Sequence, residues 1–180
     1  YWSFECNKRK ASTDKFASET LDYGLSAAQI MLHQGNKLHD QGFQGQDMVI
    51  ALLDAGFYNA DILRAFDSLR WNGQILGTRD FVKPGNDVYR EHDHGMSVLS
   101  IMGGNLPGEL IGTAPGASHW LLRTENGLNE KKIEELNWVA AAEFADSAGA
   151  DIINSSLGYS EFDDTLQNYM YEDMDGNTTF

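Results

Sequence analysis

The sequence has a single cysteine, Cys6, among its 180 residues. One thiol cannot form a disulfide within the chain, and it says little about the redox state of the compartment. No apolar run reaches the roughly 18 residues of a membrane-spanning helix, so no membrane span is predicted. Basic residues are scarce, because 13 Lys and Arg stand against 27 Asp and Glu, giving a net charge of −14. Such an acidic chain is poorly suited to nucleic acid or anionic lipid, which present phosphate charges.

Several chemical motifs are missing as well. The chain has no glycine-rich phosphate loop and no Cys/His zinc pattern. Ser155 and Ser156 do not lie in a Gly-x-Ser-x-Gly sequence, which excludes a nucleophile elbow. There is no signal peptide, and the first residue is Tyr1 rather than Met. We therefore expect a processed or trimmed product.

Length and composition predict one domain, or a large piece of one. Hydrophobic residues make up 42% of the chain, which is enough for an ordinary core. Residues 1–22 are neutral overall and weakly periodic, and we interpret them as a leader, a linker or the remnant of a pro-segment. Residues 161–180 carry six acidic residues and no basic one, which predicts an exposed loop.

Between these ends, strand patterns and helix patterns alternate. Residues 48–53 are a short apolar run, typical of a parallel strand buried on both faces, and residues 151–157 are predicted to form a further buried strand. Further strands are predicted at 74–81 and 118–123, and helices at 27–41, 61–69, 94–102 and 130–148. This alternation predicts an α/β fold with an open, mostly parallel sheet and helices on both faces.

Two residues near predicted strand ends could act together. Asp54 directly follows the apolar run 48–53, and functional groups gather beyond the carboxyl ends of parallel strands. His94 opens a predicted helix 40 residues later, and Gly95 lacks a side chain that would block close approach. By themselves, Asp54 could cap a turn and His94 could be a structural histidine. As a pair, they have the residue types of the orienting half of a nucleophilic triad.

The residues around Asp54 and His94 could also have other functions. His92 and His94 beside Asp54 also make a metal-dependent hydrolase conceivable. The other three histidines, His33, His39 and His119, have no acidic or histidine partner at the spacing of metal ligands, and we interpret them as structural. Ser156, Leu157 and Gly158 end the last predicted strand. They are either an ordinary strand exit or an edge that offers backbone groups to an extended peptide.

Five blocks of the sequence, taken in order, resemble the subtilisin-like serine proteases, the subtilase family. They span about residues 23–160 and look most like secreted bacterial members. The blocks are a first stretch from Tyr23 to Gly45, VIALLDAG around Asp54, DHGMSVLSIMGG around His94, GTAPGASHWLLR at Gly112–Arg123, and DIINSSLG at Asp151–Gly158.

The resemblance implies that residues 23–180 are the N-terminal part of a serine endopeptidase domain. Asp54 would be the triad aspartate and His94 the general base, while Ser156, Leu157 and Gly158 would bind the substrate backbone. The family's serine and oxyanion-hole asparagine would follow beyond Phe180, so this chain alone would be inactive. Its partners would be a polypeptide substrate and the C-terminal remainder of the domain. A bacterial protein that is secreted or held in the cell envelope is expected, with no required cofactor.

Three departures from the family pattern bear on this reading. Ala55 stands where the family usually has Ser or Thr, and Met96 where it usually has Thr. Both remove a hydroxyl near the Asp–His pair, so a catalytically inactive binding module is the alternative to an enzyme. The loop at 105–110, NLPGEL, lacks the Asn-rich character of the family's best-known calcium loop, and it does not support calcium binding.

Overall fold

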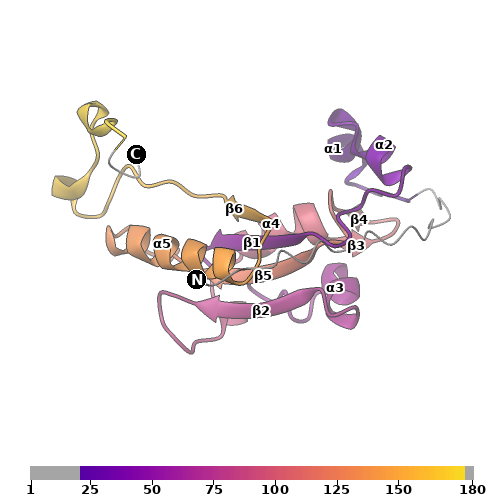
Figure 1. The fold of residues 1–180 in the computed structure, drawn as a ribbon, viewed down its shortest axis with the longest axis horizontal. Coiled ribbons are helices and arrows are strands. Elements are labelled where there is room, and N and C mark those ends of the chain that lie inside the picture. Colours follow the sequence, from indigo (N-terminus) through magenta and orange to yellow (C-terminus); the bar gives the residue numbers. More distant parts are fainter. Residues whose placement is uncertain (1–20, 177–180) are drawn as a thin grey trace, which may run out of the picture.

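The computed structural model describes residues 21–176. Of the predicted leader at 1–22, residues 1–20 therefore lie outside the described part, as do residues 177–180 of the acidic tail. Within the described part, a four-stranded sheet forms the centre of the molecule (Figure 1). The elements in chain order are α1 (Ala27–Leu32), α2 (Gly35–His39), β1 (Val49–Asp54), η1 (Arg64–Phe66), α3 (Asp67–Trp71), β2 (Ile75–Asp80), η2 (Val88–Arg90), α4 (His94–Gly103), β3 (Asn105–Leu106), β4 (Leu110–Ile111), β5 (Ser118–Arg123), α5 (Ile133–Ser147), β6 (Ile152–Ser155), η3 (Thr165–Gln167) and η4 (Tyr171–Asp173).

All four strands of the main sheet run parallel, in the order β2-β5-β1-β6. Strand β1 is an interior strand and is buried along its whole length, which explains why all of its residues before Asp54 are apolar. Its register pairs Asp54 with Arg123 at the end of β5, so the carboxyl ends of these strands meet. The predicted α/β class is confirmed. A separate antiparallel hairpin of β3 and β4 lies outside this sheet.

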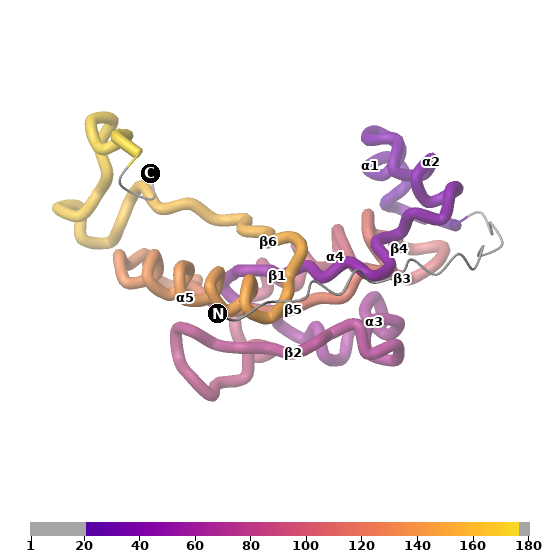
Figure 2. The backbone as a smooth tube through the Cα atoms, in the orientation of Figure 1, coloured from indigo at the N-terminus to yellow at the C-terminus, as the bar shows by residue number. Residues whose placement is uncertain are grey.

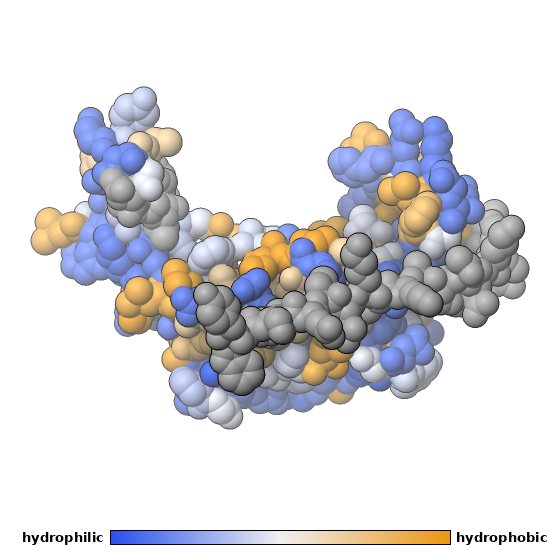
Figure 3. Space-filling model, in the orientation of Figure 1, coloured by the Kyte–Doolittle hydropathy of each residue, from blue (hydrophilic) through white to orange (hydrophobic). Residues whose placement is uncertain are grey.

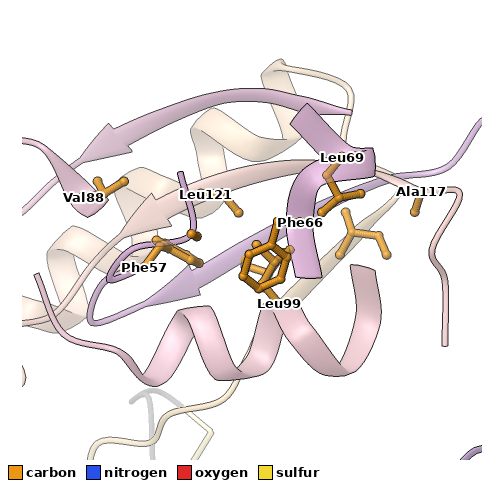
Figure 4. Packing of buried hydrophobic residues seen from close by; sticks show 10 residues of the cluster. Phe57, Phe66, Leu69, Val88, Leu99, Ala117 and Leu121 are labelled. Atoms are coloured by element: carbon orange, nitrogen blue, oxygen red, sulfur yellow. The ribbon is translucent and has the colours of Figure 1, made fainter. Parts of the chain in front are cut away.

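The two faces of the sheet are covered by different helices. On one face, α3 and α4 pack against alternate residues of β1 and β5, and Figure 4 shows Leu69, Leu99 and Leu121 meeting there. On the other face, Ala141 and Ala145 of α5 pack against the intervening residues. Each fully buried large apolar side chain contributes roughly 1.5–3 kcal/mol, so these two clusters fix the sheet between its helices.

The N-terminal helix prediction was wrong in its extent. Residues 27–41 form two short helices, α1 and α2, instead of one. Gln34 between them has a φ of +57°, a left-handed conformation that interrupts an α-helix. The helix predicted at 61–69 is likewise displaced, because the chain forms η1 and then α3 up to Trp71.

Two segments project from the sheet and leave a hollow between them. The helices α1 and α2 stand on one side, and the chain after β6 extends away on the other (Figures 1 and 2). Apolar surface lies at the bottom of the hollow, over β6 (Figure 3). The prediction that this strand is buried on both faces was wrong, because β6 lies at the edge of the sheet and its Ile152 and Ile153 are 48% and 39% exposed. The acidic stretch from 161 is mostly exposed, as predicted, although Phe162 within it is buried.

Candidate active site

Asp54 ends β1 with its side chain almost fully buried, at 1% exposure. Its Oδ1 accepts a hydrogen bond from the Ala55 N–H at 2.8 Å. Burial raises the pKa of Asp54 above its ordinary value, while hydrogen bonds from His94 and Ala55 act in the opposite direction. The carboxylate is therefore held by donors instead of by water.

His94 is the first residue of α4, and its Nδ1 lies 2.8 Å from Asp54 Oδ1 and 3.0 Å from Oδ2. The predicted juxtaposition of these two side chains is present. When Nδ1–H donates to Asp54, the neutral ring carries its lone pair on Nε2. Within residues 21–176, Nε2 has no hydrogen-bond partner, and the side chain is 48% exposed. The hydrogen bond to Asp54 raises the pKa of His94, and the nearby charges of Asp54, Glu125 and Asp93 add to this effect.

Gly95 permits this approach, as expected. A Cβ on Gly95 would lie 2.5 Å from the Gly56 carbonyl oxygen and 2.8 Å from the Asp54 Cβ. Such contacts are far shorter than van der Waals separation, so any side chain would push α4 away from the end of β1. The small residue after His94 therefore sets the distance between imidazole and carboxylate.

A buried cation supports the turn after Asp54. Arg123, 4% exposed, donates from Nε to the Ala55 carbonyl oxygen at 2.9 Å and from Nη1 to Asp80 Oδ2 at 2.9 Å. Its Nη2 also lies 3.2 Å from Glu91 Oε2. Ala55 thus uses both backbone groups, one toward Asp54 and one toward Arg123. Sequence reasoning missed this arrangement, which depends on the register of β5 beside β1.

Residues 156–158 reach the same cavity as His94. The cavity has a volume of about 300 Å³ and is open to solvent. Its lining residues are Ala55, His92, His94, Glu125, Gly127, Glu130, Ser156, Leu157 and Gly158. Strand β6 ends at Ser155, two residues earlier than predicted, so the three residues lie just beyond it. Ser156 and Gly158 are exposed and Leu157 is half-buried.

Glu125 is a cavity residue that the sequence did not single out. It follows the end of β5 by two residues and is half-buried. Burial raises the pKa of Glu125 to about 7, with further increases from the charges of Asp54, Glu130 and Glu134. Its position shortly after a predicted strand is the sequence feature that could have marked it as a site residue, as the same kind of position did for Asp54.

Of the histidines predicted to be structural, His39 and His119 are buried, whereas His33 is exposed. His39 is buried, with Nδ1 2.9 Å from the Tyr23 hydroxyl and Nε2 2.9 Å from the Thr113 carbonyl oxygen. His119 is fully buried beneath α4. His92 lines the cavity, and its Nδ1 accepts from the His94 backbone N–H at 3.1 Å.

No group of three or more His, Cys, Asp or Glu side chains is placed to hold a metal ion within residues 21–176. The predicted trio of His92, His94 and Asp54 does not form such a group. At 105–111 the chain folds into the β3–β4 hairpin, which carries a single carboxylate, Glu109.

A parallel sheet whose strand ends bring an aspartate and a histidine together has the architecture of a subtilisin-like serine protease. The chain belongs to the subtilase family, because the model of that family matches residues 45–180. This match contains the Asp54–His94 pair and the segment at 156–158.

Solved structures agree with this family. MycP1 with its N-terminal propeptide removed is 19% identical, with a TM-score of 0.52 over 76% of this chain and 37% of that protein. The prenylagaramide maturation protease PagA is 25% identical, with a TM-score of 0.51 over 69% of this chain and 39% of PagA. MycP1 from Mycobacterium smegmatis is 18% identical, with a TM-score of 0.50 over 76% and 36%. The chain thus spans less than half the length of these proteins.

Proposed function

We propose that this chain supplies the aspartate and histidine of a serine endopeptidase. The hydrogen bond of His94 Nδ1 to Asp54, at 2.8 Å, is the observation that supports this function most strongly. It leaves the Nε2 atom of an exposed imidazole available as a base beside an open cavity. The nucleophilic serine would come from a part of the protein outside this sequence.

The proposed reaction is acyl transfer to that serine, followed by hydrolysis. His94 Nε2 would take the hydroxyl proton as the serine oxygen attacks the peptide carbonyl, and would then give it to the leaving amine. Water would next attack the acyl-enzyme, with His94 again accepting a proton. Asp54 would keep the ring in the Nδ1–H tautomer and stabilise the imidazolium, without itself taking the proton.

Ser156, Leu157 and Gly158 are proposed to bind the substrate backbone. They line the cavity beside His94, and two of them are exposed. Their position just beyond the end of β6 would let an extended peptide form hydrogen bonds with their backbone groups.

Substitution of Asp54 tests the function in the full-length protein. Asp54→Asn should lower kcat for peptide hydrolysis on the order of 10⁴-fold, because the amide favours the wrong tautomer of His94. Asp93→Asn is the matched control, since Asp93 is exposed and precedes His94 without bonding to it. Near-normal turnover by Asp54→Asn would contradict the proposal.

A covalent probe distinguishes an enzyme from an inactive binding module. Neither Ala55 nor Met96 carries a hydroxyl for the Asp–His pair; Ala55 is buried and donates its N–H to Asp54, and Met96 packs against the core. A serine-directed fluorophosphonate should label the full-length protein, and His94→Ala should abolish the labelling. An unlabelled wild type would favour the binding module.

The C-terminal remainder of the same domain is the proposed partner. The edge strand β6 has exposed Ile152 and Ile153, which suits coverage by further chain. Mass spectrometry of the purified native protein should find the remaining sequence, either continuous with this chain or bound to it.

A secreted or envelope location in a bacterium is also proposed. MycP1 is described as a component of the ESX-1 type VII secretion system. Among the described residues, none of the helices is both long and apolar enough to traverse a bilayer.

A further inference from the structure

Glu125 lies in the cavity without a partner of opposite charge. It lines the same space as His94, Leu157 and Gly158. Within residues 21–176, its carboxyl forms no hydrogen bond or ion pair, and no Lys or Arg lines the cavity. The nearby Arg123 is occupied by Asp80, Glu91 and the Ala55 carbonyl. A half-buried carboxyl is therefore available to a group that enters the cavity.

The surroundings of Glu125 favour a positive charge in this space. Burial and the charges of Asp54, Glu130 and Glu134 raise its pKa to about 7, while His94 acts in the opposite direction. The other titratable residues that line the cavity are His92, His94 and Glu130. A cation close to the carboxyl would favour its ionised form and gain a charge-assisted hydrogen bond, whereas a neutral side chain would leave it unpaired.

We propose that Glu125 is a specificity-determining residue that selects a lysine or arginine side chain in the substrate. The inference rests on the proposed peptidase function and names the substrate class of that site. Residues 156–158 are proposed to hold the peptide on the amino side of the scissile bond, and Glu125 faces the cavity they share with His94. The selected side chain therefore precedes the scissile bond, and the three positions nearest to that bond are the ones to test.

Paired fluorogenic peptides test this assignment on the full-length protein. Each pair carries lysine or its neutral isostere norleucine at one of these three positions and is otherwise identical. At pH 8, lysine should raise kcat/KM about 10- to 100-fold at one position, the range expected for a hydrogen bond between charged groups. The preference should weaken from pH 8 to pH 6 as Glu125 takes up a proton.

Substitutions then assign the preference to one side chain. Glu125→Gln should lower the lysine-to-norleucine ratio to about 3 or less and remove its pH dependence. Glu143→Gln, the same change on an exposed face of α5, should retain the wild-type ratio. The ratio compares two peptides on one enzyme. A smaller fraction of folded protein would lower both rates equally and leave the ratio unchanged.

Three results would overturn the proposal while leaving the peptidase function in place. The first is that the wild type cleaves both peptides of every pair equally, the second that Glu125→Gln retains the preference, and the third that Glu130→Gln abolishes it while Glu125→Gln does not. A wild type that cleaves none of the peptides and is not labelled by the fluorophosphonate would instead overturn the proposed function and this inference together.

Discussion

At the scale of single residues, His94 has a proton equilibrium that Asp54 controls. Its pKa lies above the ordinary 6.5 because the carboxylate accepts the Nδ1–H bond and favours the imidazolium. A general base must be neutral, so activity should fall as pH drops through this raised pKa.

Asp54→Asn should accordingly lower the pKa of His94. The substitution removes the negative charge while keeping a group of similar shape, so the imidazolium loses its main stabilisation. An NMR titration of the His94 ring, in wild type and variant of the full-length protein, measures the shift. An unchanged or higher value in the variant would show that Asp54 does not govern this equilibrium.

His119 illustrates the opposite case, a histidine that burial keeps neutral. Its pKa is lowered from 6.5 to about 4 by desolvation, and neither ring nitrogen has a hydrogen-bond partner within the described chain. Above pH 6.5 the residue is neutral in both folded and unfolded states and adds no pH dependence. Between pH 6.5 and 4 only the unfolded state takes up the proton, so folding stability is lost over this range.

Replacing His119 should reduce this loss of folding stability at acid pH. A shift of this size corresponds to about 3 kcal/mol at most. His119→Leu places an apolar side chain that cannot titrate at this buried position, so its free energy of unfolding should decline less than that of wild type between pH 7 and 4.5. Urea denaturation at several pH values provides the measurement, and parallel curves for the two proteins would argue against the assigned pKa.

At the scale of elements, the contact of α4 with the end of β1 depends on Gly95. Gly95→Ala should destabilise the full-length protein by about 1–3 kcal/mol, the usual effect of overpacking, although alanine favours a helix. Peptidase activity should also fall, because His94 moves with the helix. Thermal melting and kcat/KM measure the two effects, with Ser97→Ala on the exposed side of α4 as the control. Wild-type values for Gly95→Ala would contradict the tight contact.

The central strands were predictable because their signal is local. Residues 48–53 are uninterruptedly apolar, and β1 differs from the prediction by one residue at each end. The break between α1 and α2 was not predictable in this way. Ile30 packs against Ile111, and His39 reaches Thr113, so the conformation at Gln34 depends on contacts with residues more than 70 positions away.

The candidate site was predictable in part for the same reason. Asp54 and His94 occupy a strand end and a helix start, positions that the sequence pattern marks. Arg123 and Glu125 also lie at a strand end, but their roles depend on which strand pairs with β1 and in which register. Local periodicity carries no information on that pairing.

At the scale of the whole chain, the net charge of −14 on these 180 residues opposes the compact state by self-repulsion. Raising ionic strength from 0.01 to 0.15 M shortens the screening length from about 30 to about 8 Å. The thermal midpoint of the protein should therefore rise by about 2–4 °C, which corresponds to roughly 1 kcal/mol at this size. Calorimetry at the two salt concentrations checks this, and a falling midpoint would mean that attractive ion pairs outweigh the repulsion.

The central position of β1 has a consequence for how the protein folds. Its two neighbours, β5 and β6, lie about 70 and about 100 residues further along the chain. Neither edge of β1, the strand that carries Asp54, can therefore be paired until these later segments of the chain have been synthesised. Large loops have to close before those contacts form, and topologies of this kind fold slowly. During synthesis, the most apolar strand of the sheet is consequently the one exposed longest to misassociation and to chaperones.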